Sequence, residues 1–174
     1  MSADDPVTLR AARPTDLDFL VALYASTRAD EFAAMGWPVE TERAFMRMQF
    51  DAQRRDYEQR HPGAAIDIVE QCRCPIGRLW VAQDARSLTV LDIAIVAELR
   101  GRGIGTECLQ RVLRRADLAG LDVELQVVVG NPAQRLYERL GFRAVGPGGV
   151  RRAMVRQPAS PVMNPSQEIP HEQA

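Results

Sequence analysis

A glycine-rich turn between an apolar segment and an amphipathic one most constrains what this chain can fold into. Residues 88–96 are almost entirely apolar, residues 108–118 carry apolar side chains at helical spacing, and between them stands Arg100-Gly101-Arg102-Gly103-Ile104-Gly105-Thr106. This pattern predicts a central strand, a turn and a helix. The first turn of a helix leaves backbone N–H groups unpaired, its dipole favours negative charge, and glycines let a ligand approach closely. We therefore expect a phosphate-bearing ligand at this turn.

The composition is that of one globular domain. The chain has 174 residues, of which 46% are hydrophobic, and its net charge of −1 argues against a nucleic-acid partner held by bulk charge. No apolar run approaches the roughly 20 residues needed to span a bilayer, and the N-terminus lacks the apolar core of a signal peptide. Three cysteines suggest a reducing compartment. We expect a cytoplasmic protein with no membrane partner and, since Cys72 and Cys74 have no second ligand pair, no metal site.

The order of apolar patterns predicts an α/β (α+β) fold. Strand-like and helix-like segments follow one another as β-α-α-β-β-β-α-β-α-β-β within residues 1–156. We expect a mixed seven-stranded sheet with helices on both faces. Residues 88–96 and 122–129 are expected to lie parallel, because a helix joins them. Residues 157–174 lack periodicity and are expected to form a disordered tail.

Two classes of phosphate site are excluded by the residues present at the turn. A P-loop requires a lysine, and all 22 basic residues of this chain are arginine. A dinucleotide-binding turn requires a third glycine where this chain has Thr106. The remaining class is a coenzyme A site.

Two motifs together resemble those of the GNAT acetyltransferase superfamily. Arg100-x-x-Gly103-x-Gly105 is similar to the family's Arg/Gln-x-x-Gly-x-Gly/Ala signature and follows the expected fourth strand. The segment Asn131–Phe142 resembles the family's Asn-x-Ala-x-x-x-Tyr-x-x-x-Gly-Phe, and the element order is similar over about residues 7–156. The resemblance implies the GNAT fold and an acetyl-CoA-dependent N-acetyltransferase, with acetyl-CoA as co-substrate.

The resemblance also implies a role for each residue of the coenzyme site. Backbone N–H groups of the turn would bind the pyrophosphate, the backbone of the central strand would bind the pantetheine arm as an added strand, and Tyr137 would protonate the departing thiolate. Plainer interpretations are that Asn131 caps a helix and that Tyr137 fills space between helix and sheet. The residues so assigned to the coenzyme are Ile93, Ala94, Ile95, Arg100, Gly101, Arg102, Gly103, Ile104, Gly105, Thr106 and Asn131.

The general base departs from the family pattern. Some members place a glutamate on the fifth strand, where this chain has Gln126, and an amide cannot accept the proton. Asp92 and Glu31 are the alternatives, together with a relay of water molecules. Because burying an unpaired carboxylate is costly, Asp92 in an apolar strand must be either hydrogen-bonded or functional.

Residues 28–60 are expected to face the acceptor. Trp37, Met46, Phe50 and Tyr57 could line its pocket, or could equally be core or dimer contacts. No cluster of charges along the sequence marks an anionic or a polyamine acceptor. We expect acetyl transfer to a primary amine of a small molecule or of a protein N-terminus. The alternative is a coenzyme A-binding module that has lost catalysis, and an apolar edge after residue 145 would allow a homodimer.

Overall fold

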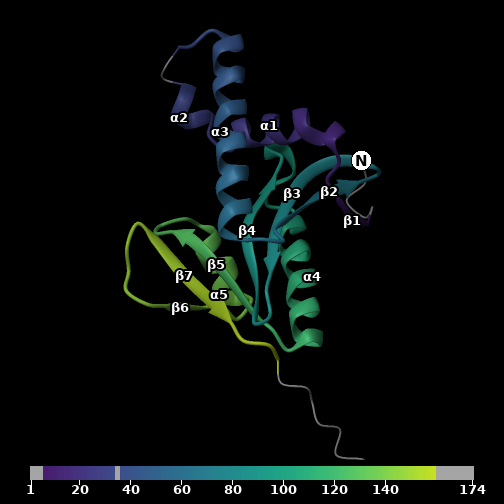
Figure 1. Cartoon of the computed structure of the whole chain (residues 1–174), viewed down its shortest axis with the longest axis vertical. Helices are drawn as coiled ribbons and strands as arrows, with labels where there is room; N and C mark the ends of the chain where they lie inside the picture. Colours follow the sequence, from purple (N-terminus) through teal and green to yellow (C-terminus); the bar gives the residue numbers. More distant parts are fainter. Residues whose placement is uncertain (1–5, 34–35, 160–174) are drawn as a thin grey trace, which may run out of the picture.

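The computed structural model describes residues 6–33 and 36–159, and most of the expected tail, residues 160–174, lies outside this part (Figure 1). The strands are β1 (Val7–Ala11), β2 (Ala65–Gln71), β3 (Cys74–Gln83), β4 (Ser87–Ile95), β5 (Asp122–Val128), β6 (Arg143–Val145) and β7 (Arg151–Arg156). The helices are α1 (Leu17–Ser26), α2 (Ala29–Ala33), α3 (Val39–Arg60), α4 (Ile104–Ala119) and α5 (Ala133–Arg139), with short 3-10 turns at Pro14–Asp16 and Ala97–Leu99.

The sheet is mixed, as the element order predicts. Its seven strands lie in the order β1-β2-β3-β4-β5-β7-β6, and only β4 and β5 are parallel neighbours. Helix α4 connects these two strands, and a parallel pair requires such a crossover. The other neighbours are antiparallel, in agreement with the short connections between β2, β3 and β4.

The parallel pair separates part-way along its length. Residues Ser87–Val90 pair with Asp122–Leu125, after which β4 and β5 continue without further pairing to each other. A β-bulge in β4 lies at this point. Trp80 of β3 pairs with Asp92 and Val81 pairs with Val90, so Leu91 is left without a partner residue on β3. Bulges increase strand twist and bend the strand. The two strands therefore diverge beyond Val90 and Leu125 (Figure 1), and we call the unpaired stretch between them the opening.

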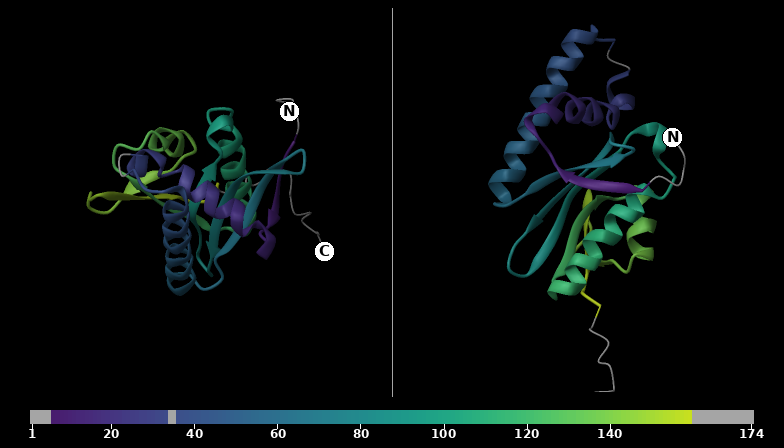
Figure 2. Two further views of the ribbon diagram at one scale, coloured as in Figure 1. Left: turned by 90° about the horizontal axis from the view of Figure 1, so that it is seen from above. Right: turned by 90° about the vertical axis from the view of Figure 1, so that its right-hand side faces the viewer.

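Helices cover both faces of the sheet, with a separate apolar core under each layer. Figure 2 shows α1 and α3 on one face and α4 and α5 on the other. Along β5 the odd-numbered residues Val123, Leu125 and Val127 are buried in the core with α4, whereas the side chains between them are exposed on the α3 face. Met46 and Phe50 of α3 are buried in the core with α1, so the plainer interpretation of these two residues is the correct one.

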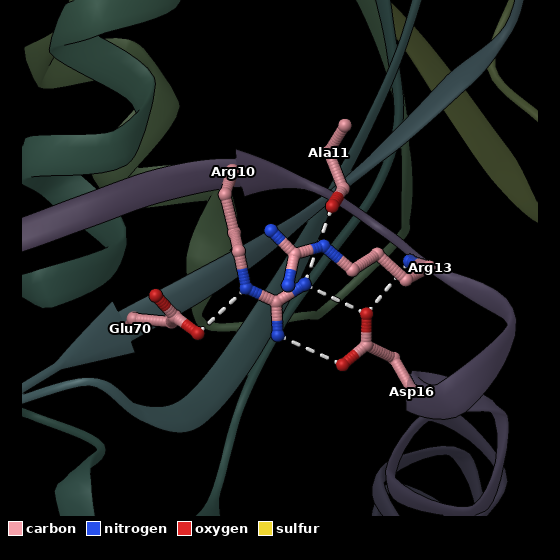
Figure 3. A network of polar contacts seen from close by, with 5 residues as sticks. All are labelled: Arg10, Ala11, Arg13, Asp16 and Glu70. Carbon is pink, nitrogen blue, oxygen red and sulfur yellow. Dashed lines mark hydrogen bonds and ion pairs between the residues drawn. The ribbon is translucent and has the colours of Figure 1, made fainter.

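A network of hydrogen bonds and ion pairs connects β1 to β2 and to the turn that precedes α1 (Figure 3). The Arg10 Nε donates to Glu70 of β2 at 2.7 Å, and its two terminal nitrogens donate to the Asp16 carboxylate at 2.7 and 2.8 Å. The same carboxylate accepts the backbone N–H of Arg13 at 2.7 Å, at the entry to α1. Hydrogen bonds from Arg10 lower the pKa of Asp16 to about 2.

Candidate active site

The glycine-rich turn lies where the sequence predicts it, between β4 and α4. Gly101 and Gly103 have φ angles of +74° and +82°, a conformation that side chains with a Cβ rarely adopt. The N–H of Glu107 donates to the carbonyl of Gly103 at 3.0 Å and is the first to complete a turn of α4. The N–H groups of Ile104, Gly105 and Thr106 therefore precede the first helical hydrogen bond and are available to a ligand.

Open space lies beside the glycines of the turn. A Cβ added at Gly101 or Gly103 would meet no atom within 4 Å, and one added at Gly105 would meet only Ile93 at 3.9 Å. Arg102 is exposed beside the turn. The Nε of Arg100 donates to the carbonyl of Ile95 at 2.9 Å and so joins the turn to the end of β4.

The edge of β4 that faces β5 directs backbone N–H groups into the opening. The N–H of Val96 donates toward β3, to the carbonyl of Ile76 at 2.9 Å. Backbone groups of successive strand residues point to alternate sides of the strand. Ile95 and Ile93 therefore direct their N–H groups into the opening, whereas Ala94 faces β3. An extended ligand lying in the opening could pair with β4 as an added strand.

Tyr137 of α5 is half-buried near this edge. Its ring packs against the core under α4 and against Phe142, with 5.9 Å between the ring centroids. Within the described part of the chain its hydroxyl has no hydrogen-bond partner. Burial raises the pKa of the Tyr137 hydroxyl, and the negative charge of Asp92 raises it further. The hydroxyl is therefore protonated at neutral pH and free to donate.

Asp92 is hydrogen-bonded, which was one of the two alternatives that the sequence left open. Its Oδ2 accepts from the Nε of Arg78 at 2.6 Å, and the Arg78 side chain is only 2% exposed. The guanidinium lies over the rings of Phe50 and Tyr24, at 5.5 and 5.7 Å from their centroids. The other carboxylate oxygen of Asp92 accepts no hydrogen bond within residues 6–33 and 36–159. Asp92 thus balances a buried charge and keeps one oxygen open.

Two adjoining hollows lie on the α3 face of the sheet, where β4 and β5 begin to separate. Their volumes are about 320 and 440 Å³, and both are lined by Tyr57, Arg60, Gln126 and Arg151. The Tyr57 hydroxyl donates to the carbonyl of Leu91, at the bulge, at 3.2 Å. Burial raises the pKa of Tyr57. A molecule in these hollows would approach the opening from the face opposite to α4.

Sequence comparison identifies the family of this chain. A model of the acetyltransferase (GNAT) family matches residues 22–142. The chain belongs to the GNAT family. The family resemblance, the GNAT fold and the acetyltransferase class predicted from the two motifs are therefore confirmed. No curated protein matches the sequence.

Solved structures show the same GNAT fold. The PaiA N-acetyltransferase of Thermoplasma acidophilum in complex with coenzyme A is 16% identical, with a TM-score of 0.67 over 87% of this chain and 99% of that one. An acetyltransferase of Thermus thermophilus is 24% identical, with a TM-score of 0.63 over 87% of this chain and 96% of that one. The seven strands described here thus form a GNAT sheet.

The structure gives the surroundings of three further residues singled out from the sequence, Asn131, Trp37 and Glu31. The Asn131 Oδ1 accepts the N–H of Ala133, the first residue of α5, at 2.9 Å, although the N-cap position of this helix is taken by Pro132. Trp37 packs against Phe32 and Phe45 and lines neither hollow. Glu31 is exposed, pairs with an arginine of its own turn at 3.5 Å, and is likewise outside both hollows.

Sequence reasoning missed three residues that line the hollows on the α3 face of this GNAT domain. Glu124 lines the smaller hollow, two residues before Gln126 on the same face of β5. The alternation of β5 could have revealed it, since residues two apart share a face. Arg28 and Arg151 line the larger hollow, but they are far apart in the chain and no local pattern joins them.

No metal site or membrane span is found in the described part of the GNAT chain. Within residues 6–33 and 36–159, no three side chains of His, Cys, Asp or Glu are grouped so that they could hold a metal ion. No helix in those ranges combines the length and the apolar character needed to cross a membrane.

Proposed function

We propose that this GNAT protein transfers the acetyl group of acetyl-CoA to a primary amine of a small molecule or peptide by direct attack, with Tyr137 as the general acid. One observation carries the proposal. The free edge of β4 lies between two open sites: the N-terminus of α4 on one face and the two hollows on the other. A thioester held along β4 and an amine in the hollows would meet in the opening.

The backbone of β4 would position the thioester. The N–H of Ile93 and that of Ile95 face the opening, and either can donate to the thioester carbonyl oxygen. Such donors stabilise the oxyanion that forms when an amine attacks, and they act most strongly where water is excluded. The N–H groups of residues 101–106 would bind the pyrophosphate at the other end of the coenzyme.

Tyr137 would supply a proton as the C–S bond breaks. A thiol has a pKa of about 8.5 and a free tyrosine about 10. The pKa of Tyr137 is raised above its usual value by burial and by Asp92, so the proton is present throughout the neutral range. The leaving sulfur would take this proton while the tetrahedral intermediate collapses, and the tyrosine would recover a proton from the attacking nitrogen or from solvent.

The amine must lose a proton before or during attack, and Gln126 cannot take it. Neutralising an amine of pKa about 10.4 at pH 7 costs about 4–5 kcal/mol, whereas an α-amine of pKa about 7.8 costs about 1 kcal/mol. Asp92 has one unbonded carboxylate oxygen and acts electrostatically on both Tyr57 and Tyr137. We propose Asp92 as the base, acting directly or through water.

Substitution of Tyr137 by Phe tests the proposal. We expect kcat to fall about 10²- to 10⁴-fold, the usual contribution of a general acid. Acetyl-CoA affinity, measured by calorimetry, should change little, because the hydroxyl acts on the leaving sulfur. For the wild type we expect kcat/KM to rise with pH through the pKa of the acceptor amine, with no descending limb below about pH 10, because the raised pKa of Tyr137 keeps it protonated.

The competing function is a coenzyme A-binding module without catalysis, which Gln126 favours because it stands on the wall of both hollows. Tight acetyl-CoA binding with no coenzyme release across a broad panel of amines would support that function. An unchanged kcat in Tyr137→Phe would instead leave acetyl transfer intact and remove this tyrosine from the mechanism.

A further inference from the structure

We infer that the acceptor carries an anionic group, most simply a carboxylate, beside the amine that is acetylated. This inference rests on the proposed acetyl transfer and names the chemical class of its acceptor. The observation behind it is the charge on the wall of the larger hollow, which is about 440 Å³ in volume. Arg28, Arg60 and Arg151 line this hollow, and Asp56 is the one carboxylate among its lining residues.

The three arginines come from three separate parts of the chain. Arg28 lies between α1 and α2, Arg60 is the last residue of α3, and Arg151 is the first residue of β7. The chain as a whole has a net charge of −1, so this concentration of positive charge is local. No run of the sequence is basic here, so the three charges come together only in the folded chain.

The register between β5 and β7 places Arg151 on the α3 face of the sheet, where the two hollows lie. Arg151 pairs with Val128, and Ala153 pairs with Gln126, so Arg151 stands on the same face as Gln126, one side-chain position further along the sheet. Its charge reaches Tyr57, whose pKa it acts to lower against the larger effect of burial. Arg151 is exposed and has no carboxylate partner within the described residues.

The other two arginines are held in place and partly neutralised. Arg60 pairs with Asp56 and lies 5.8 Å from the centroid of the Tyr57 ring. Arg28 lies 4.7 Å from the centroid of the Tyr24 ring and pairs with Glu31 at 3.5 Å, on the solvent side. Contacts with aromatic faces restrict the orientation of a guanidinium group. The unpaired Arg151 is therefore the cation most available to a ligand.

Arginine suits this role because its planar fork can donate two parallel hydrogen bonds to one carboxylate. The smaller hollow differs, since Glu124 balances part of its positive charge and His61 is nearby. An amino-acid-like acceptor would place its carboxylate toward Arg151 and Arg28. Its amine would then point past Gln126 to the opening between β4 and β5.

Matched acceptors test the inference. Initial rates of coenzyme A release would be measured for an α-amino acid, for its α-amino amide, which lacks the negative charge, and for the corresponding α-aminophosphonate. We expect the wild type to prefer the amino acid over the amide by at least about tenfold in kcat/KM. The amide is the less basic amine, so its deprotonation is easier and works against the expected preference.

Variants locate the origin of the preference. Arg151→Ala should lower kcat/KM for the amino acid about 10- to 100-fold, mainly through KM, and leave the amide nearly unaffected. Arg151→Lys should recover part of the lost kcat/KM, because lysine restores the positive charge but lacks the planar guanidinium group that donates two parallel hydrogen bonds. Arg55→Ala is the matched control, since Arg55 is exposed on α3 and lines neither hollow.

The outcomes separate this inference from the function on which it rests. A preference for the phosphonate that depends on Arg151 supports an anionic acceptor and assigns the anion to a phosphonate or phosphate. Equal kcat/KM for amino acid and amide in the wild type overturns the inference and leaves acetyl transfer standing. Bound acetyl-CoA with no turnover of any acceptor overturns the proposed function, and this inference with it.

Discussion

Arg78 and Asp92 form a nearly buried ion pair, and the charge of Asp92 acts on Tyr57 and Tyr137. The Arg78 side chain is 2% exposed, its Nε is bonded to Asp92, and its Nη1 is without a partner in the described part of the chain. Leaving one charge of such a pair unpaired is far more costly than replacing both by apolar residues. A single substitution at Asp92 therefore changes stability as well as chemistry, and the two effects must be separated.

We predict that Asp92→Asn lowers the free energy of unfolding by about 3 kcal/mol, because Arg78 loses its charged partner. Urea denaturation followed by tryptophan fluorescence measures this change in unfolding free energy, since Trp80 lies in the core formed with α1 and α3. The double variant Arg78→Met, Asp92→Leu should return to within about 1 kcal/mol of the wild type. If Asp92 is the base, kcat stays low in the double variant; a stable and fully active double variant would remove Asp92 from the chemistry.

Asp16 makes the stability of the fold depend on pH in the acid range. Its pKa is lowered to about 2 by hydrogen bonds from Arg10, so its ionised form stabilises the native state above about pH 4, and this contribution is lost as the pH falls through about 2. We predict that Asp16→Asn costs roughly 1–2 kcal/mol at pH 7 and progressively less below pH 4. Denaturant titrations at pH 7, 4 and 2.5 would show the difference shrinking.

Asp18→Asn is the matched control for this prediction. Asp18 is exposed two residues later and pairs only loosely with Arg47, at 3.5 Å. Its substitution should change stability by less than about 0.5 kcal/mol at each pH. A pH-independent cost for Asp16→Asn would mean that its hydrogen bonds matter and its charge does not.

At the scale of elements, β4 depends on a close approach from β3. A Cβ at Gly77 would lie 2.5 Å from the carbonyl oxygen of Ala94 and 2.6 Å from the side chain of Ile95. We predict that Gly77→Ala displaces this end of β4, costs about 1–3 kcal/mol in stability and weakens acetyl-CoA binding at least about tenfold. Thermal unfolding and calorimetry measure the two effects.

The control for Gly77→Ala is Gly148→Ala, where an added Cβ meets no atom within 4 Å. That variant should bind acetyl-CoA as the wild type does. Should Gly77→Ala lose stability yet keep full affinity, the backbone of β4 near Ile95 would not be part of the coenzyme site.

The regular elements could be read from the sequence because each follows one rule of periodicity. The apolar run that predicts a central strand is β4, and the helix that follows the turn is α4. The short helix α2 was missed, since five residues carry too little periodicity to register. The bulge at Leu91 was also missed, because it depends on how β3 and β4 pair and leaves no mark in either strand alone.

The two halves of the site differ in how far the sequence reveals them. The proposed coenzyme half is built from consecutive residues, so the turn at 100–106 and the segment 131–142 appear as motifs. The proposed acceptor half joins Arg28, Tyr57, Gln126 and Arg151, which only tertiary structure brings together. For Trp37 the sequence left a pocket wall and a core or dimer contact open, and in the structure it packs in an aromatic cluster with Phe32 and Phe45.

At the scale of the whole molecule, the sheet consists of two parts joined at one short ladder. Four residue pairs, from Ser87 with Asp122 to Val90 with Leu125, connect β1–β4 to β5–β7. We predict that acetyl-CoA slows amide hydrogen exchange in β7 and in residues 126–128 more than in β1 and β2. Exchange measured by mass spectrometry with and without acetyl-CoA tests this, and equal protection of all strands would contradict it.

Beyond this ladder the two parts of the sheet share no hydrogen bonds between β4 and β5 within the described residues. Coenzyme bound along β4, as proposed above, would add contacts there, and its release would remove them. Gln126 and Arg151 both lie beyond the ladder, on β5 and β7. The proposed acceptor site is thus bounded on one side by residues that coenzyme binding would connect to β4, so we expect the bound coenzyme to favour acceptor binding.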